Sequence, residues 1–177
     1  MPSGKTHDLI TLLLAAPTFA VAWALTESVA LAGIVTGATL FGGFMFGPDL
    51  DIMSRQYTRW GVFRFIWFPY RVVFRHRSRW SHGILFGTLI RVFYFAGMLT
   101  VITSAAVYLR AMLMAGGVLP GWNEVAHAWL SIESSIAVLG INRSAAWAVL
   151  SGLWWGAASH TLTDVGWSVV RKALEIF

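Results

Sequence analysis

The stretch that decides the fold is residues 9–47, LITLLLAAPTFAVAWALTESVALAGIVTGATLFGGFMFG, in which Glu27 is the only formally charged side chain. A helix needs about 20 mainly apolar residues to cross a hydrocarbon core about 30 Å thick. The stretch therefore predicts two transmembrane helices, near 9–26 and 29–47. Only Thr26-Glu27-Ser28 separates them, so we expect a tight turn and two antiparallel neighbours.

Two further apolar stretches, 83–113 and 144–163, bring the expected number of transmembrane helices to about four. The whole chain is 57% hydrophobic and only 12% charged, whereas about a quarter of the residues in a soluble domain are charged. We therefore predict an all-α membrane protein that forms a single membrane domain over residues 1–177. Glycines four apart, as in Gly33/Gly37 and Gly43/Gly47, favour close helix packing in lipid.

An alternative for the N-terminus is a cleaved signal peptide over residues 1–24. Lys5 precedes the first apolar run, and Ala22-Trp23-Ala24 is compatible with a cleavage site. The run is longer than the apolar region of a usual signal, and Asp8 lies where such a signal has positive charge. We therefore favour a retained first helix.

The connection over residues 48–82 decides the predicted orientation. Seven of the eleven arginines lie between Arg55 and Arg79, and positive residues in short loops mark the cytoplasmic side. Positive charge also lies near both termini, at Lys5, Arg171 and Lys172, and it assigns the termini to the cytoplasmic side as well. We expect a multi-pass protein with a basic cytoplasmic loop at 48–82 and both termini in the cytoplasm.

Within this loop, residues 60–74 are apolar but short, and Arg64, Pro69 and Arg71 interrupt them. This pattern predicts an amphipathic segment lying in the membrane interface. The arginines around it favour contact with membrane lipids, especially anionic headgroups. One alternative function is a module that only adheres to such lipids. No nucleic-acid partner is expected, and a homo-oligomer is compatible with the sequence.

Histidine and aspartate gather at the predicted cytoplasmic ends of the helices. The chain has no cysteine, which excludes thiolate metal sites and disulfides, so any metal would bind through imidazole and carboxylate. Ionisable groups near a bilayer are costly and seldom lack a partner or a function. The residues that this topology brings to one level, and that we predict as metal ligands, are His7, Asp49, Asp51, His76, His82, His160 and Asp164.

Spacing suggests how these ligands are presented. His160 and Asp164 are four apart, so they share one face of a helix. Asp49 and Asp51 alternate after Pro48 and would point the same way in an extended segment. His76 and His82 are six apart and need an intervening turn, and we expect Ser81 to cap the third transmembrane helix. For the two aspartates, a solvated acidic turn is the structural alternative.

A mixed His/Asp set suits zinc first, with manganese, iron or magnesium also compatible, and seven ligands would serve one ion or two. In a hydrolase, Asp51 would take a proton from water activated by the ion. Arg77 would hold a phosphate, since a guanidinium matches phosphate oxygens in two-pronged fashion. The alternative is a non-enzymatic metal-binding protein for storage, delivery or structural support.

The motifs PSGKTHD (2–8), PDLD (48–51), RHRSRWSHG (75–83) and HTLTD (160–164) give the chain a resemblance to known proteins. In order and spacing they resemble a bacterial family of small membrane proteins described as uncharacterised metal-binding proteins. More distantly, the chain is similar to membrane-bound metal-dependent hydrolases. The resemblance implies metal binding in a bacterial inner-membrane protein and, by analogy, hydrolysis. The charge pattern adds the expectation that the site faces the cytoplasm, and the arginines add that the substrates are phosphoesters or lipid phosphates.

Overall fold

A computed structural model describes residues 2–114, 116, 118–137 and 142–174, and within those ranges every regular element is a helix. The chain divides into two compact units, one of Met1–Phe93 with Arg143–Phe177 and one of Tyr94–Asn142. The second unit holds most of α7 (Phe86–Met114), and α8 (Trp122–Ala137) with the exposed His127. The first unit contains all the predicted ligands.

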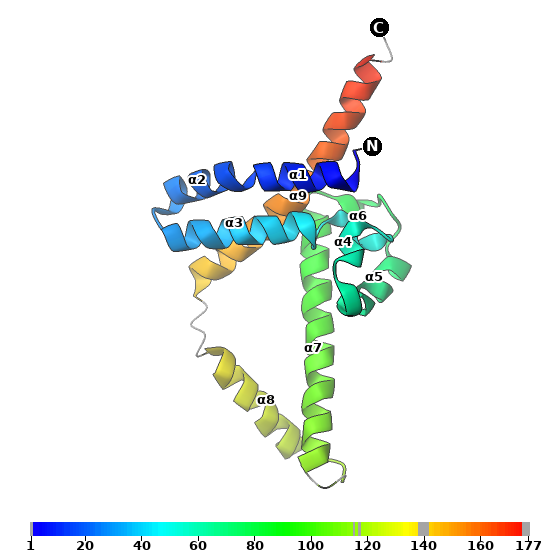
Figure 1. Cartoon of the computed structure of the whole chain (residues 1–177). Coiled ribbons are helices and arrows are strands. Elements are labelled where there is room, and N and C mark those ends of the chain that lie inside the picture. Colours follow the sequence, from blue (N-terminus) through cyan, green and yellow to red (C-terminus); the bar gives the residue numbers. More distant parts are fainter. Residues whose placement is uncertain (1, 115, 117, 138–141, 175–177) are drawn as a thin grey trace. The chain divides into compact units, whose positions relative to one another are not determined.

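The predicted helical hairpin is present. α1 (Gly4–Leu13) and α2 (Ala15–Thr26) follow one another with a break at Leu14, and Pro17 explains the break because its ring clashes with the carbonyl four residues earlier. Glu27 turns the chain with a left-handed φ of 51°. Ser28 then caps α3 (Val29–Phe44), its hydroxyl accepting from the Leu31 amide, and α3 runs back beside α2 (Figure 1).

α9 (Arg143–Leu174) passes behind α3 in the view of Figure 1, and it also contacts α2, because Trp155 Nε1 donates to Thr18 Oγ1 at 3.1 Å. Glycine makes the crossing close: a Cβ on Gly156 would collide with the carbonyl of Thr39, and one on Gly152 with the carbonyl of Val35. The prediction for Gly33 and Gly37 is wrong, because both have open space where a side chain would stand. Gly43, from the other predicted pair, does lie close against Thr11 of α1, and Gly152 and Gly156 of α9 provide the close approach to α3.

Among the residues that the structure describes, three helical stretches are long and apolar enough to cross a membrane, namely Gly4–Thr26, Val29–Asp51 and Phe86–Met114. The fourth predicted span, 144–163, lies within α9. That helix is long enough but less apolar, because serine, glycine, threonine, tryptophan and His160 interrupt its aliphatic residues. Length and composition therefore support three of the four expected spans.

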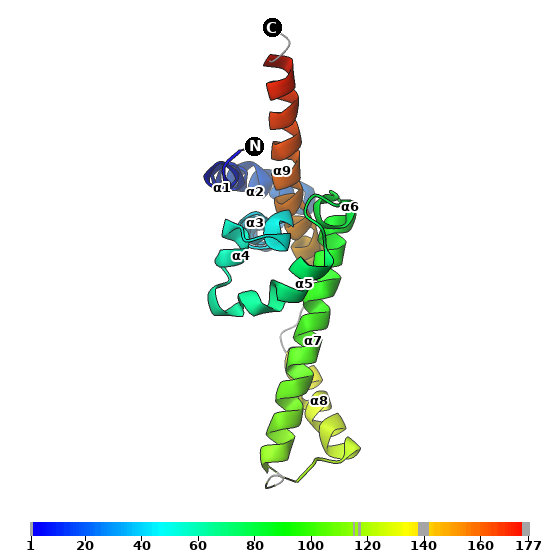
Figure 2. The same ribbon diagram turned by 90° about the vertical axis from the view of Figure 1, so that its right-hand side faces the viewer.

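The basic loop folds into short helices: η1 (Pro48–Asp51), α4 (Arg55–Thr58), η2 (Gly61–Trp67), α5 (Phe68–Val73) and α6 (Arg79–His82). Figure 2 shows these helices beside the end of α3. The predicted amphipathic segment corresponds to η2 and α5. Its buried side includes Trp67 and Tyr70, while Val62 and Phe68 are exposed. Buried aromatic side chains thus give the loop a core of its own.

Candidate metal centre

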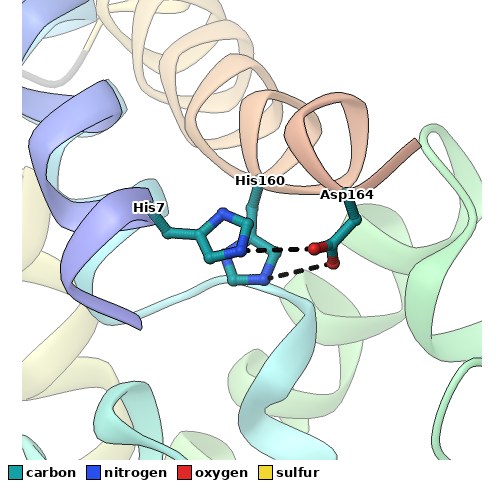
Figure 3. Close-up of side chains that lie close together, drawn as sticks. All are labelled: His7, His160 and Asp164. Carbon is teal, nitrogen blue, oxygen red and sulfur yellow. Dashed lines mark ion pairs between the residues drawn. The ribbon is translucent and has the colours of Figure 1, made fainter. Parts of the chain in front are cut away.

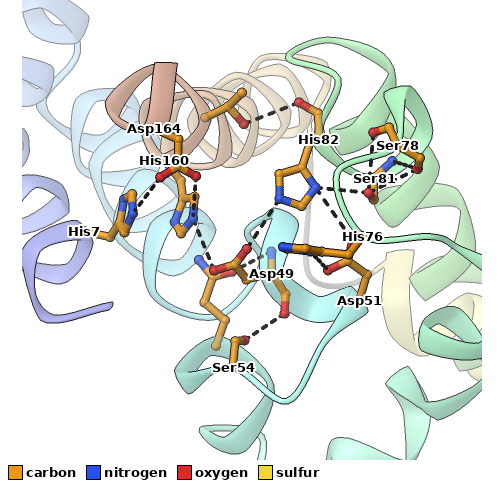
Figure 4. Close-up of polar contacts among 12 residues, drawn as sticks. His7, Asp49, Asp51, Ser54, His76, Ser78, Ser81, His82, His160 and Asp164 are labelled. Carbon is orange, nitrogen blue, oxygen red and sulfur yellow. Dashed lines mark hydrogen bonds and ion pairs between the residues drawn. The ribbon is translucent and has the colours of Figure 1, made fainter. Parts of the chain in front are cut away.

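The structure brings all seven predicted ligands into one cluster (Figure 4). Five separate segments contribute: α1, η1, the turn before α6, α6 itself and α9. Each carboxylate contacts two imidazoles through its oxygens, so carboxylates and imidazoles alternate along the cluster. In order of contact its members are His7, Asp164, His160, Asp49, His82, Asp51 and His76.

His7, His160 and Asp164 form the first triad, which could hold one metal ion (Figure 3). The Nε2 atom of His7 lies 3.3 Å from Asp164 Oδ1, and that of His160 lies 3.8 Å from Asp164 Oδ2. The spacing of four residues along α9 places His160 and Asp164 together, as predicted. The two histidines are buried and Asp164 is half-buried, so this triad is the enclosed part of the cluster.

Asp49, His76 and His82 form the second triad. Asp49 joins the two triads, since its Oδ1 lies 3.4 Å from His82 Nε2 and its Oδ2 lies 3.3 Å from His160 Nε2. Asp51 borders the second triad: its Oδ1 lies 2.9 Å from His76 Nδ1 and its Oδ2 lies 3.6 Å from His82 Nδ1. His76 is exposed, so this triad is the more open of the two.

The spacing of these atoms fits a metal ion. Two N or O ligands about 2.1 Å from an ion lie about 3.0 to 3.4 Å apart for angles between 90° and 109°. Three of the contacts between imidazole nitrogen and carboxylate oxygen are 3.3, 3.3 and 3.4 Å long. A small cavity of about 20 Å³ adjoins His7, Asp49 and His160, which is room for about one water or ion.

Buried polar atoms without hydrogen bonds also indicate a metal site. Asp51 Oδ2, His82 Nε2 and Asp164 Oδ1 are buried and have no hydrogen-bond partner within the described part of the chain. Their imidazole–carboxylate contacts, at 3.3 to 3.6 Å, do not count as hydrogen bonds. Burying polar groups without a hydrogen bond is costly, and three carboxylates gathered in one cluster require compensating positive charge. One or two divalent ions would satisfy both needs, so the residues present fit a His/Asp metal centre.

The segment that presents Asp49 and Asp51 differs from the prediction. It is not extended but a 3₁₀ turn, opened by Pro48, which suits that position because a proline needs no hydrogen-bond partner there. Gln56 anchors the turn by accepting from the Asp49 amide at 3.2 Å and donating to the Gly43 carbonyl at 2.7 Å. Both carboxylates nevertheless reach the cluster, and the solvated acidic turn is excluded for Asp51, which is buried.

The turn expected between His76 and His82 is present. The Ser78 amide donates to the Arg75 carbonyl at 3.1 Å, and Arg77 takes a left-handed φ of 61°. The predicted capping role of Ser81 is wrong, because Ser78 caps α6 and α7 begins only at Phe86. Ser81 is buried inside α6, where its Oγ lies 3.0 Å from His82 Nδ1 and donates to the Arg75 carbonyl.

Two supporting groups were missed by the sequence analysis. Arg91 is almost fully buried and donates to the Ser81 carbonyl at 2.6 Å and to Thr88 Oγ1 at 3.1 Å, so it holds the residue that precedes His82. Asp8, next to His7, accepts from both Nη atoms of Arg59 at 2.8 and 2.6 Å. An arginine inside an apolar span is itself a signal, whereas nothing in the sequence pairs Asp8 with Arg59.

Arg77, predicted to hold a phosphate, lines a second and larger cavity of about 350 Å³ that also adjoins His82 and Asp164. Other arginines of the basic loop have structural contacts. Arg55 and Arg59 pair with Asp8, and Arg71 lies over the ring of Tyr57 at 4.4 Å. Arg55, Arg59 and Arg71 thus have contacts that support the fold, whereas Arg77 lies on the cavity beside the predicted ligands.

An all-helical chain with two joined His/Asp groups belongs to the class of proteins equipped to bind metal through imidazole and carboxylate. The particular family follows from comparison: the model of the uncharacterised metal-binding protein family (DUF2227) matches residues 2–174, and the chain belongs to that family. An uncharacterised protein of Aquifex aeolicus (strain VF5) is 43% identical over 56 residues, which are 31% of this chain and 39% of the length of that relative. No solved structure matches.

The family agrees with the resemblance to metal-binding proteins that the motifs predicted. The relationship to membrane-bound metal-dependent hydrolases stays a prediction.

Proposed function

We propose that this protein is a membrane-embedded, metal-dependent hydrolase of phosphoester or lipid-phosphate substrates. The observation that supports it best is the joining of two His/Asp triads through the two oxygens of Asp49. A carboxylate placed between two ligand groups is suited to bridge a pair of ions, and paired ions are common in enzymes that cleave phosphate esters. We propose zinc as the metal, at one or two ions per chain.

The proposed location is the bacterial inner membrane, with four spans and the metal centre facing the cytoplasm. Three apolar helices support the membrane assignment, and α9 would be the fourth span, with Gly152 and Gly156 against α3. The arginines near the site support a cytoplasmic orientation. Exposed members of that group, Arg64, Arg75 and Arg79, would contact anionic headgroups.

The proposed chemistry is hydrolysis, in which a water oxygen bonds to phosphorus, the bond from phosphorus to the ester oxygen breaks, and the departing alcohol gains a proton. A bound divalent ion would polarise the phosphoryl group and lower the pKa of the attacking water. Asp51 would accept the proton of that water, because it is a buried carboxylate whose partners are two imidazoles. Arg77 would neutralise charge on the phosphoryl oxygens.

The second candidate is a metal-binding protein without catalytic activity. The burial of His7 and His160 favours it, because enclosed ligands are typical of structural sites whereas catalytic sites keep an open coordination position. The two candidates differ in the role they give Asp51. A catalytic base is needed for turnover, whereas a storage site needs only the ligands.

The test combines metal analysis with turnover on a panel of phosphomonoesters and phosphodiesters. Purified, zinc-loaded wild type should contain one or two ions and hydrolyse at least one substrate. Asp51→Asn should retain most of its metal and lose activity by about 10²-fold to 10⁴-fold, while His127→Ala in the second unit should match wild type. If the protein binds metal but hydrolyses no substrate of the panel, the hydrolase is refuted and the non-enzymatic metal-binding function remains. If the wild type binds no metal, both candidate functions are refuted.

A further inference from the structure

The larger cavity beside the metal centre follows one face of α9. The residues of α9 that line it are Thr161, Asp164, Val165, Ser168, Val169 and Lys172, a spacing of three and four that marks one helical stripe. Arg77 and His82 close it on the other side. Ligands of both triads therefore lie at one end of the cavity, since Asp164 belongs to the first and His82 to the second.

The stripe changes in character along its length. From Asp164 to Lys172 it extends about 12 Å at 1.5 Å per residue. The ligand end has Arg77 and the hydroxyl of Thr161, which donates to the His82 carbonyl at 3.5 Å. The methyl groups of Val165 and Val169 follow, and Lys172 ends the stripe. A cavity that holds a cation beside metal ligands and an apolar wall beyond them can receive a molecule with an anionic head and an apolar body.

Arg77 provides an independent indication. Its φ of 61° lies in the left-handed region, which is unfavourable for an arginine and is concentrated at ligand clamps and active sites. An ordinary φ at this residue would redirect the turn between His76 and Ser78. The turn therefore holds Arg77 next to the ligand His76 and, at the same time, on the wall of the cavity.

We propose that this cavity binds a phosphate monoester of an apolar alcohol, with the phosphate at the end formed by Arg77, His82 and Asp164 and the alcohol chain along Val165 and Val169. The inference rests on the proposed metal-dependent hydrolysis and names its substrate class. Size supports an ester over free phosphate, because 350 Å³ is about ten times the volume of a water molecule and lies within the range of small-ligand pockets. Lys172, at the opposite end of the cavity, would add positive charge that attracts the anionic ester into the cavity.

The test is calorimetric titration of the full-length, zinc-loaded protein in dodecyl maltoside micelles, with empty micelles as the blank. The probes are inorganic phosphate, butyl phosphate, hexyl phosphate and hexyltrimethylammonium. Hexyl phosphate should bind at least about tenfold more tightly than inorganic phosphate, because each buried methylene contributes up to about fourfold. The cationic probe, which has the same chain, should not bind.

Two variants locate the binding site. Val165→Thr combined with Val169→Thr keeps the side-chain shape and should reduce the preference for hexyl phosphate to below about threefold. Lys172→Met should weaken all three phosphates about twofold to fivefold, whereas Lys5→Met, the same change on α1, should not. All three variants should retain the metal content of wild type.

The outcomes separate the two proposals. A protein that holds metal but binds hexyl phosphate no more tightly than inorganic phosphate overturns the apolar part of the site and leaves the metal centre intact. Unchanged chain-length preference in the valine variant overturns the assigned location. A wild type that holds no metal refutes the metal centre itself, and the substrate class falls with it.

Discussion

The imidazole rings of His7 and His160 lie stacked, with their centroids 3.7 Å apart and their planes inclined by 10°. Two protonated rings at that distance would repel each other by about 4 kcal/mol at an effective dielectric constant near 20. The pair therefore favours at least one neutral ring, which is the form that binds metal. Each ring directs its Nε2 atom toward a different oxygen of Asp164, so the stacking arranges two nitrogens around one carboxylate.

Metal stoichiometry should distinguish the triads. His160→Ala removes a ligand of the first triad, and we expect the metal content of a two-ion protein to fall by about one ion per chain. Asp49→Ala should lower it further, because one oxygen of Asp49 faces each triad. The measurement is elemental analysis by mass spectrometry of purified protein. Equal losses in the two variants would contradict the bridging position of Asp49, and His127→Ala serves as the control.

Arg91 should stabilise the second triad without contacting metal. Arg91→Met leaves the buried Ser81 carbonyl unsatisfied, which should destabilise the fold by about 1–3 kcal/mol and weaken metal binding through His82. Thr88→Val removes only the hydroxyl that accepts from Arg91 Nη2 and should cost less. Thermal unfolding and metal content report the two effects. An Arg91→Met protein with wild-type stability and metal content would show that this arginine does not position His82.

The crossing of α3 and α9 should tolerate no side chain at Gly156. Gly156→Ala forces a methyl group against the Thr39 carbonyl, a backbone atom that cannot move aside cheaply, and should destabilise by about 1–3 kcal/mol. Gly166→Ala is the matched control, because the same helix has open space there. It should leave stability unchanged or raise it by up to about 1 kcal/mol. Thermal unfolding in micelles measures both, and equal behaviour would contradict the close crossing.

Arg59 should act through Asp8 on the position of His7. Arg59→Lys keeps the charge but cannot bond both carboxylate oxygens in the planar, two-pronged way of a guanidinium. We expect metal affinity to fall by up to about tenfold, as when outer-shell partners of metal ligands are changed. Arg64→Lys, on the exposed part of η2, is the control. Competition with a fluorescent chelator measures the affinity, and identical values in both variants would exclude a positioning role.

Sequence alone was sufficient for the parts of the fold that depend on local pattern. The apolar runs predicted the hairpin of α2 and α3, and the assignment of helix ends to one level predicted that residues from His7 to Asp164 would converge. The spacing of four residues was enough to pair His160 with Asp164. The hairpin and the pairing of His160 with Asp164 could be predicted because helix length and periodicity are local properties, whereas the convergence needed the further assumption that the apolar runs cross one bilayer.

The remaining features depend on contacts between distant segments. Gly156 could not be chosen over Gly33 without knowing that α9 crosses α3 at that point. The conformation of residues 48–51 depends on Gln56, which belongs to another helix, and the role of Arg91 depends on the end of α6. Such pairings are set by tertiary packing, which a single sequence does not encode in any local pattern.

The first triad combines a residue near the start of the chain with two near its end. A ribosome therefore completes α1, the hairpin and the basic loop long before His160 and Asp164 are synthesised, and during that interval His7 has no triad to join. A metal ion held by the first triad would therefore bind late in biogenesis, after α9 has been made, whereas the second triad is complete in sequence once His82 has been synthesised. A chain truncated before residue 160 would still contain His7, Asp49 and Asp51, but it would lack two of the three ligands of the enclosed first triad.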